Sequence, residues 1–141
     1  MATLSLIRIS RHMRELDICM MVTESKRGGL NSRPMSNNKD VSYKGDSYFF
    51  TYEGSQKIKD LETSPKVSLN FEGKNGLYIS IQGRARLIRN KELFEEHWVP
   101  GLKQWFKEGT ETPGMVLIHV KGSKLRYWQK NKEGEIKVGS R

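Results

Sequence analysis

The stretch "YFFTYEGSQKIKDL", Tyr48 to Leu61, gathers a hydroxyl, a glycine and a lysine where an aromatic run ends. Ser55 can cap a following helix, which places Lys57 in its first turn. The free N–H groups of a first helical turn and the helix dipole attract anions, and a lysine adds a charge-assisted hydrogen bond. These residues predict an anion site of the kind that holds phosphate. A plain helix cap with a solvated lysine is the alternative.

Two other short stretches carry residues suited to a phosphorylated, planar ligand. In "NSRPMS", Arg33 precedes Pro34 on a predicted strand. A strand arginine can form a bidentate pair with phosphate or stack on a planar ring, or it can simply face solvent. In "YWQ", Trp128 lies near the end of a β-segment. It can cover a flat heterocycle there, although burial in a core is the commoner role of a tryptophan.

Several catalytic classes lack their signatures. The sequence contains no Gly-x-Gly-x-x-Gly after a strand, no P-loop and no Gly-x-Ser-x-Gly. His12, His97 and His119 occur in three unrelated segments without metal-ligand spacing, so we expect surface or core-edge histidines and no metal site. Cys19 lies in the apolar run "DICMMVT", which predicts a buried structural thiol. A hydrolase or metalloenzyme is therefore disfavoured.

Composition limits the class of protein and its partners. The 141 residues predict one domain, 1–141, and the net charge of +9 is spread along the chain. This charge attracts polyanions and phosphorylated ligands, but a scattered pattern is more typical of a solvated basic face, which disfavours a nucleic-acid role. No apolar run approaches the roughly 20 residues of a membrane span. A single cysteine excludes an internal disulfide and predicts a cytoplasmic location.

The elements that must position these residues are mostly strands. Apolar spacing predicts a helix over 6–16, and Ser55 begins a short helix that ends at Thr63. Strict alternation over 67–72 and 77–87 predicts a hairpin, with a bulge or a close backbone approach at Gly83. The remaining predicted elements are strands at 17–25, 30–36 and 46–52, a helix after Asn90 that Pro100 breaks, an irregular connector at 101–114, and two strand segments around Gly122.

The tail, 130–141, is polar, and we expect it to fray. Six or seven strands joined mostly by short turns, with two or three inserted helices, predict a mainly β fold. An antiparallel barrel with helical additions is favoured over a doubly wound parallel sheet.

The three ligand motifs occur in an order that resembles the FMN-binding split barrels related to pyridoxamine 5′-phosphate oxidase, and especially the general stress protein branch. Each motif is weak alone, but five in this order are fairly specific. The resemblance runs from Leu6 to Gln129. Its motifs are "SRPM" at 32–35, "FFT" at 49–51 with Ser-x-Lys at 55–57, "S-x-x-G-x-A" at 80–85, "W-F-x-x-G" at 105–109 and "YW" at 127–128.

The resemblance implies a six- to seven-stranded antiparallel split barrel that forms a homodimer, with FMN (or FAD) bound in two clefts at the subunit interface. The oxidases place another basic residue where Gln56 stands, so a weaker grip on phosphate is implied. By position, the cofactor site comprises Arg33, Pro34, Met35, Phe50, Thr51, Ser55, Gln56 and Lys57 of one subunit, with Trp128 lent by the partner.

The chain also departs from its relatives. In the oxidases an Arg-rich segment after the aromatic-Trp-Gln contacts substrate, whereas "KNKEGEIKV" contains neither arginine nor histidine. In the connector, Lys107 and Thr112-Pro113 replace the Pro and Asp-Pro of the stress branch. The missing arginine and histidine in the C-terminal segment disfavour oxidation of pyridoxamine phosphate, whereas the connector residues concern the loop beside the cleft.

The resulting prediction is a stress-related, FMN-dependent oxidoreductase or reductase of a small molecule, whose electron donor and acceptor the sequence does not identify. One alternative is a non-catalytic flavin or nucleotide binder, for instance a sensor. The other is a basic nucleic-acid module, which solvent-facing aromatics interleaved with Lys and Arg would support.

Overall fold

The computed structural model describes residues 4–37 and 42–139. Its strands are β1 (Ile18–Glu24), β2 (Leu30–Ser36), β3 (Asp46–Tyr52), β4 (Lys66–Glu72), β5 (Leu77–Ile88), β6 (Met115–Gln129) and β7 (Lys132–Lys137). Within the same residues the helices are α1 (Leu6–Met13), α2 (Gln56–Thr63) and α3 (Lys91–His97), with short 3-10 segments η1 (Lys74–Gly76), η2 (Pro100–Gln104) and η3 (Gly109–Glu111).

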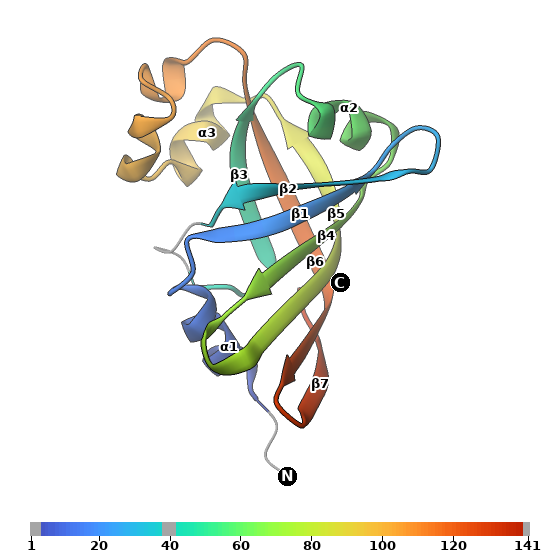
Figure 1. Cartoon of the computed structure of the whole chain (residues 1–141). Helices are drawn as coiled ribbons and strands as arrows, with labels where there is room; N and C mark the ends of the chain where they lie inside the picture. Colours follow the sequence, from blue (N-terminus) through green and yellow to red (C-terminus); the bar gives the residue numbers. More distant parts are fainter. Residues whose placement is uncertain (1–3, 38–41, 140–141) are drawn as a thin grey trace.

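The strands form one antiparallel sheet that curls on itself (Figure 1). The strand order is β2-β1-β4-β5-β6-β3, and β7 pairs with β6 beside this path. Since β2 and β3 end the path, and no pairing joins them among the residues described, the barrel is open along a seam between these two edges. The predicted mainly β, antiparallel split barrel of six to seven strands is confirmed.

The alternation of apolar and polar residues in the sequence places apolar side chains on one face of the sheet and polar ones on the other. In β4 and β5, Leu69, Phe71, Ile79 and Ile81 face the core, while their neighbours face outward. The register between β5 and β6 shifts at Gly83, as predicted. A Cβ at this position would lie 2.5 Å from the Lys121 carbonyl oxygen, so the bulge requires a glycine, which has no side chain to clash there.

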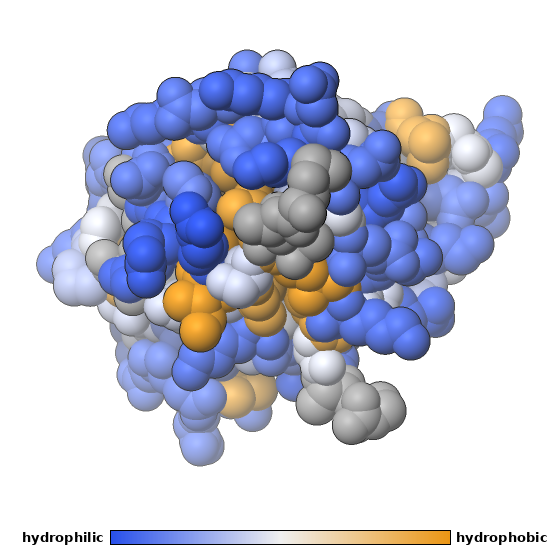
Figure 2. Space-filling view, turned by 90° about the horizontal axis from the view of Figure 1, so that it is seen from below, coloured by the Kyte–Doolittle hydropathy of each residue, from blue (hydrophilic) through white to orange (hydrophobic). Residues whose placement is uncertain are grey.

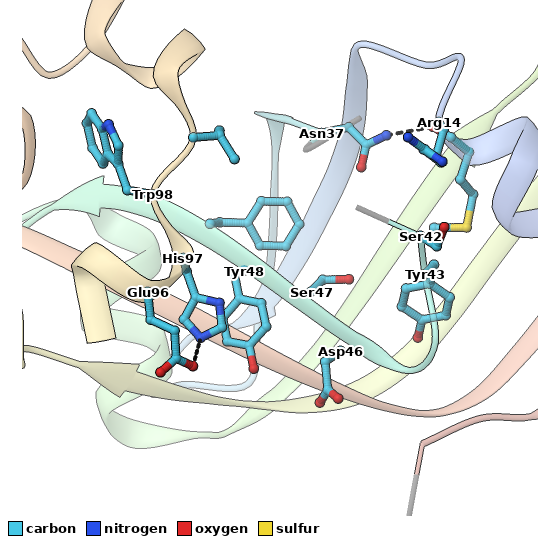
Figure 3. Close-up of a pocket in the computed structure, with 13 residues that line it drawn as sticks. Arg14, Asn37, Ser42, Tyr43, Asp46, Ser47, Tyr48, Glu96, His97 and Trp98 are labelled. Atoms are coloured by element: carbon cyan, nitrogen blue, oxygen red, sulfur yellow. Dashed lines mark hydrogen bonds and ion pairs between the residues drawn. The ribbon is translucent and has the colours of Figure 1, made fainter. Parts of the chain in front are cut away.

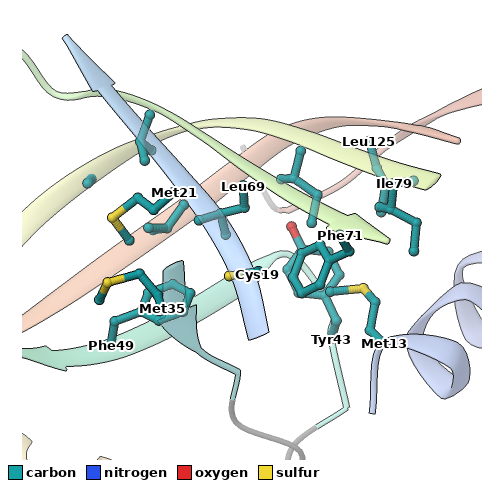
Figure 4. Close-up of a cluster of buried hydrophobic side chains, with 14 of the residues drawn as sticks. Met13, Cys19, Met21, Met35, Tyr43, Phe49, Leu69, Phe71, Ile79 and Leu125 are labelled. Carbon is teal, nitrogen blue, oxygen red and sulfur yellow. The ribbon is translucent and has the colours of Figure 1, made fainter. Parts of the chain in front are cut away.

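Two hydrophobic clusters hold the elements. The larger fills the barrel and includes Met21, Leu69 and Cys19, whose thiol pKa burial raises to about 12 (Figure 4). The prediction that this thiol is buried is confirmed. The smaller cluster lies where α3 packs on β5 and β6, and its buried members are Ile88, Phe94, Phe106, Met115 and Leu117. This second cluster fixes α3 and η2 beside the open seam.

The structure corrects two expectations near the C-terminus. The segments around Gly122 form one continuous strand, β6, because the bulge lets the chain stay paired with β5. The tail does not fray at 132–137; it turns back at Lys130, which has φ 55°, and forms β7. Ile136 packs against the barrel core, and Val138 is buried. These two apolar residues anchor an otherwise polar segment.

The surface reflects the composition. Figure 2, seen from below relative to Figure 1, shows hydrophilic side chains over most of this face, with apolar groups exposed between them. Every helix within residues 4–37 and 42–139 is too short or too polar to cross a lipid bilayer.

Candidate functional site

A cleft of about 730 Å³ lies at the open seam of the barrel. The edge strands β2 and β3 form its two sides, α2 supplies Lys57 at one end, and the chain from His97 to Phe106 closes the other. Of the predicted site residues, five line this cleft: Pro34, Met35, Phe50, Thr51 and Lys57. This volume lies in the usual range of small-molecule sites, roughly 300–1,000 Å³.

The helix predicted after Gly54 begins as expected. Gly54 has φ +84°, which suits a glycine, and Ser55 takes the N-cap position of α2. The Ser55 hydroxyl makes no cap hydrogen bond; it donates instead to the Tyr52 carbonyl oxygen at 3.3 Å. The first-turn N–H groups of α2 therefore remain without a side-chain acceptor from Ser55, and an external anion can use them.

Arg33 is not among the residues that line the cleft, and its guanidinium is fixed by contacts with β1 and α2. Its Nη1 donates to Thr23 Oγ1 at 2.8 Å and to the Met21 carbonyl oxygen at 3.2 Å. Its Nη2 lies 3.7 Å from Asp60 Oδ2, and the side chain is 18% exposed. Burial lowers the pKa of Arg33, and the Asp60 charge opposes that effect. The guanidinium thus has a fixed orientation and a partial counter-charge.

The counter-charge is a buried carboxylate that joins three elements. Asp60 of α2 is 1% exposed and accepts hydrogen bonds from Thr23 of β1 at 2.7 Å, Asn31 of β2 at 2.9 Å and Gln56 of α2 at 2.9 Å. Burial alone would raise the Asp60 pKa, but the three hydrogen bonds and the charge of Arg33 together lower it. Asp60 is therefore an ionised, fully bonded group at neutral pH.

Lys57 adds a second cation at this end. Burial and the charge of Arg33 lower its pKa, and no carboxylate forms an ion pair with its ammonium among the residues described. Of these two neighbouring cations, only Arg33 lies beside a carboxylate, Asp60, among the residues described. An anion placed between the first turn of α2, Lys57 and Arg33 would meet a net positive charge and free N–H donors.

Sequence reasoning missed Thr23, Asn31 and Asp60. A threonine in the apolar strand "ICMMVTE" and an aspartate on the buried side of α2 are the signals that could have found them, because buried polar groups need partners. Gln56 was predicted to contact the ligand directly. Its side-chain amide donates to Asp60 Oδ1 at 2.9 Å, and its contact with the ligand stays a prediction.

Aromatic side chains surround the other end of the cleft. Phe50 makes edge contacts with Phe94 and Trp98 of the second cluster, and Tyr52 Oη donates to the Trp105 carbonyl oxygen at 2.9 Å. Trp105 itself is 58% exposed at the rim. These rings provide flat apolar surfaces against which a planar group can pack.

Tyr48 links this cleft to a second, smaller pocket of about 230 Å³ (Figure 3). Its ring stacks between His97, at a centroid distance of 3.7 Å, and His119, at 4.5 Å. His119 Nε2 lies 2.8 Å from Asp46 Oδ1, and its Nδ1 accepts from Arg86 Nε at 3.1 Å. Pairing of β3 with β6 brings His119 to one side of Tyr48, and packing of α3 brings His97 to the other, which their sequence spacing did not reveal. Among the residues described, no group of His, Cys, Asp or Glu is arranged to hold a metal ion.

Trp128 lies apart from the cleft within one chain. It projects from the outer face of β6 opposite Tyr78 of β5, and the Arg126 guanidinium lies 5.3 Å from its ring centroid. Arg126 also pairs with Glu133 at 3.5 Å and Glu135 at 3.9 Å. Exposed aromatics beside an arginine match part of the nucleic-acid pattern, but the two glutamates neutralise that arginine.

Comparison with known proteins identifies the family. The family model described as pyridoxamine 5'-phosphate oxidase like matches residues 5–140. The chain belongs to this family. Two relatives are protein bli-3 of Neurospora crassa, 31% identical over 80% of this chain, and general stress protein 26 of Bacillus subtilis, 25% identical over 56%. The matched regions span 59% of the length of each relative. The predicted resemblance is therefore confirmed.

Several solved structures share the fold. A protein related to general stress protein 26, from Clostridium acetobutylicum, superimposes with a TM-score of 0.83 at 18% identity, covering 94% of both chains. A heme binding protein from Mycobacterium smegmatis gives 0.77 at 10% identity, covering 97% of this chain and 60% of its own. At such identities these likenesses show the split barrel and nothing finer.

Proposed function

We propose that the protein binds FMN in the seam cleft and acts as an FMN-dependent oxidoreductase or reductase of a small molecule. The observation that carries the proposal is a pair of neighbouring cations, Arg33 and Lys57, at the first turn of α2. Among the residues described, Asp60 is the carboxylate beside Arg33, and none forms an ion pair with Lys57. Family membership supports the same ligand class.

The residues present fit a ligand with an anionic end and a planar end. Arg33, Lys57 and the N–H groups of α2 would hold the phosphate. Thr51 of β3 lines the same cleft as Lys57 and would lie along a polar chain between phosphate and ring. Phe50 and Trp105 would pack against the ring at the far end. Bound FMN would supply hydride and electron transfer, while the protein binds, orients and shields it.

We extend the proposal to a homodimer in which Trp128 completes the partner's cleft. Four large apolar side chains are exposed on the outer faces of β1, β5 and β6: Ile18 at 49%, Met20 at 40%, Tyr78 at 49% and Trp128 at 36%. Exposed apolar groups of this kind support association. A two-fold dimer that buries this face would bring Trp128 of each subunit toward the other. The buried free thiol of Cys19 supports a reducing, cytoplasmic location.

A visible spectrum of the purified protein, repeated during titration with FMN, tests the central proposal. Uptake of FMN with a flavin absorption band is expected, and reduced nicotinamide should then bleach the band if the protein is a reductase. Binding without turnover would favour a flavin binder or sensor. Absence of FMN uptake would reject the proposal. Titration with hemin tests whether the protein binds heme instead, the ligand in the name of the mycobacterial structure.

Mixing two variants tests the subunit arrangement. Lys57→Ala and Trp128→Ala are each expected to bind FMN weakly. In mixed dimers, one of the two clefts combines an intact Lys57 with an intact Trp128 from the other chain. Tight binding should therefore reappear on mixing and subunit exchange. If Trp128 serves its own chain, or the protein is a monomer, mixing restores nothing.

A further inference from the structure

Thr23 has a buried hydroxyl that makes two hydrogen bonds, one as donor and one as acceptor. The residue is 1% exposed in β1, beside the otherwise apolar barrel core. Its Oγ1 donates to Asp60 Oδ2 at 2.7 Å and accepts from Arg33 Nη1 at 2.8 Å. A hydroxyl has one proton to donate, so this proton is committed to the carboxylate and the lone pair to the guanidinium. Thr23 therefore connects the two charges directly.

Among the residues described, the network leaves some N–H groups of Arg33 without a hydrogen-bond acceptor. Nη1 is occupied by Thr23 and the Met21 carbonyl, whereas Nη2 is 3.7 Å from Asp60, longer than a hydrogen bond. The remaining N–H groups of the guanidinium can serve a ligand, in a plane set by the Nη1 bonds. Lys57, whose pKa is lowered partly by Arg33, marks the side on which a ligand would meet both cations.

From this geometry we infer that Thr23 and Asp60 are positioning residues that present Arg33 to the ligand's phosphate and so select FMN over riboflavin. This inference rests on the proposed FMN site and deepens it. Riboflavin carries the same ring and ribityl chain without phosphate, so its binding does not use an oriented guanidinium. Fixed donors bind a phosphate better than mobile ones because less conformational entropy is lost on binding.

The network also assigns Gln56 a role other than ligand contact. Its amide donates to Asp60 Oδ1 at 2.9 Å, while Thr23 and Asn31 bond Oδ2. Both oxygens of the carboxylate are thereby fixed, and with them the distance to Arg33. Gln56 therefore positions Arg33 indirectly, by fixing Asp60. The oxidases have a basic residue at this position.

The test compares Thr23→Val with Thr23→Ser in FMN and riboflavin titrations of the full chain. Valine keeps the shape and removes the hydroxyl; serine keeps the hydroxyl. Thr23→Val should weaken FMN binding about tenfold, the effect of losing a hydrogen bond to a charged group, and leave riboflavin affinity within about twofold. Thr23→Ser should stay near wild type for both ligands. In an Arg33→Met background, Thr23→Val should cause no further loss.

Each other outcome overturns the inference. Equal losses for FMN and riboflavin would mean general damage to the cleft, and wild-type FMN affinity in Thr23→Val would mean that the hydroxyl orients nothing. A wild-type protein that binds neither flavin rejects the proposed function itself, whereas the first two results reject only the role of Thr23. If Thr23→Val does not fold, Asn31→Ala removes one hydrogen bond from the same carboxylate. This variant should lower the affinity for FMN about threefold and leave the affinity for riboflavin unchanged.

Discussion

The two ends of the seam cleft are built in opposite ways. At the α2 end, Arg33 and Asp60 are fixed by hydrogen bonds to side chains on β1, β2 and α2. At the far end, rings from β3 and the connector make edge or tilted contacts, and Trp105 is largely exposed. Directional bonds suit recognition of an anion, whereas ring packing tolerates different orientations. Changes at the first end should therefore affect folding and anion selectivity, and changes at the second should affect all planar ligands alike.

The largest effect should follow Asp60→Asn. This substitution leaves the half-buried guanidinium of Arg33 without its counter-charge, and breaking such a pair costs about 3 kcal/mol of unfolding free energy. Urea denaturation measures the loss. The matched control is Glu62→Gln on the same helix, whose exposed carboxylate pairs with Arg89 at 3.2 Å and should contribute less than about 1 kcal/mol. Equal losses in the two variants would contradict the contrast between buried and exposed pairs.

The same carboxylate predicts a pH dependence of stability. The pKa of Asp60 is lower in the folded chain than its ordinary value of about 3.9, so the unfolded chain takes up the proton first as pH falls. The stabilisation by Asp60 is then fully present above about pH 5 and is lost as pH drops through the folded pKa. The difference in unfolding free energy between wild type and Asp60→Asn should be constant from pH 7 to about pH 5 and shrink below about pH 4. A difference that grows on acidification would contradict an ionised Asp60.

Lys57→Ala tests the ligand side of the same end. Within the described part of the chain the Lys57 ammonium forms no ion pair, so the unfolding free energy should change little, while FMN affinity should fall at least about tenfold, or roughly 1.4 kcal/mol. Riboflavin affinity should stay near wild type. Lys59→Ala, an exposed lysine two residues along α2, is the control for loss of charge alone. Equal losses for the two lysines would indicate long-range attraction instead of direct contact with phosphate.

Local signals explain what the sequence could predict of this site. The strand, glycine and helix around Gly54 follow from short-range rules of alternation and capping, and "SRPM" lies on an edge strand as its proline suggests. Partners far apart in the chain could not be inferred. Thr23 and Asp60 are 37 residues apart, and the rings of Tyr48, His97 and His119 meet only through pairing of β3 with β6 and packing of α3. The prediction that the polar tail frays was wrong because two apolar residues, Ile136 and Val138, pack into or against the core and anchor β7.

Trp105→Ala should have the smallest effect and should mark the other end of the cleft. The ring is 58% exposed, so unfolding free energy should change by less than about 0.5 kcal/mol. Loss of one ring contact is worth about 0.6 kcal/mol, which predicts a threefold weaker affinity for FMN and for riboflavin alike. Trp105→Phe, which keeps an aromatic surface, should recover most of the affinity in the same titrations. A loss confined to FMN would show that Trp105 senses the phosphate, and the division of the cleft into an anion end and a ring end would then be wrong.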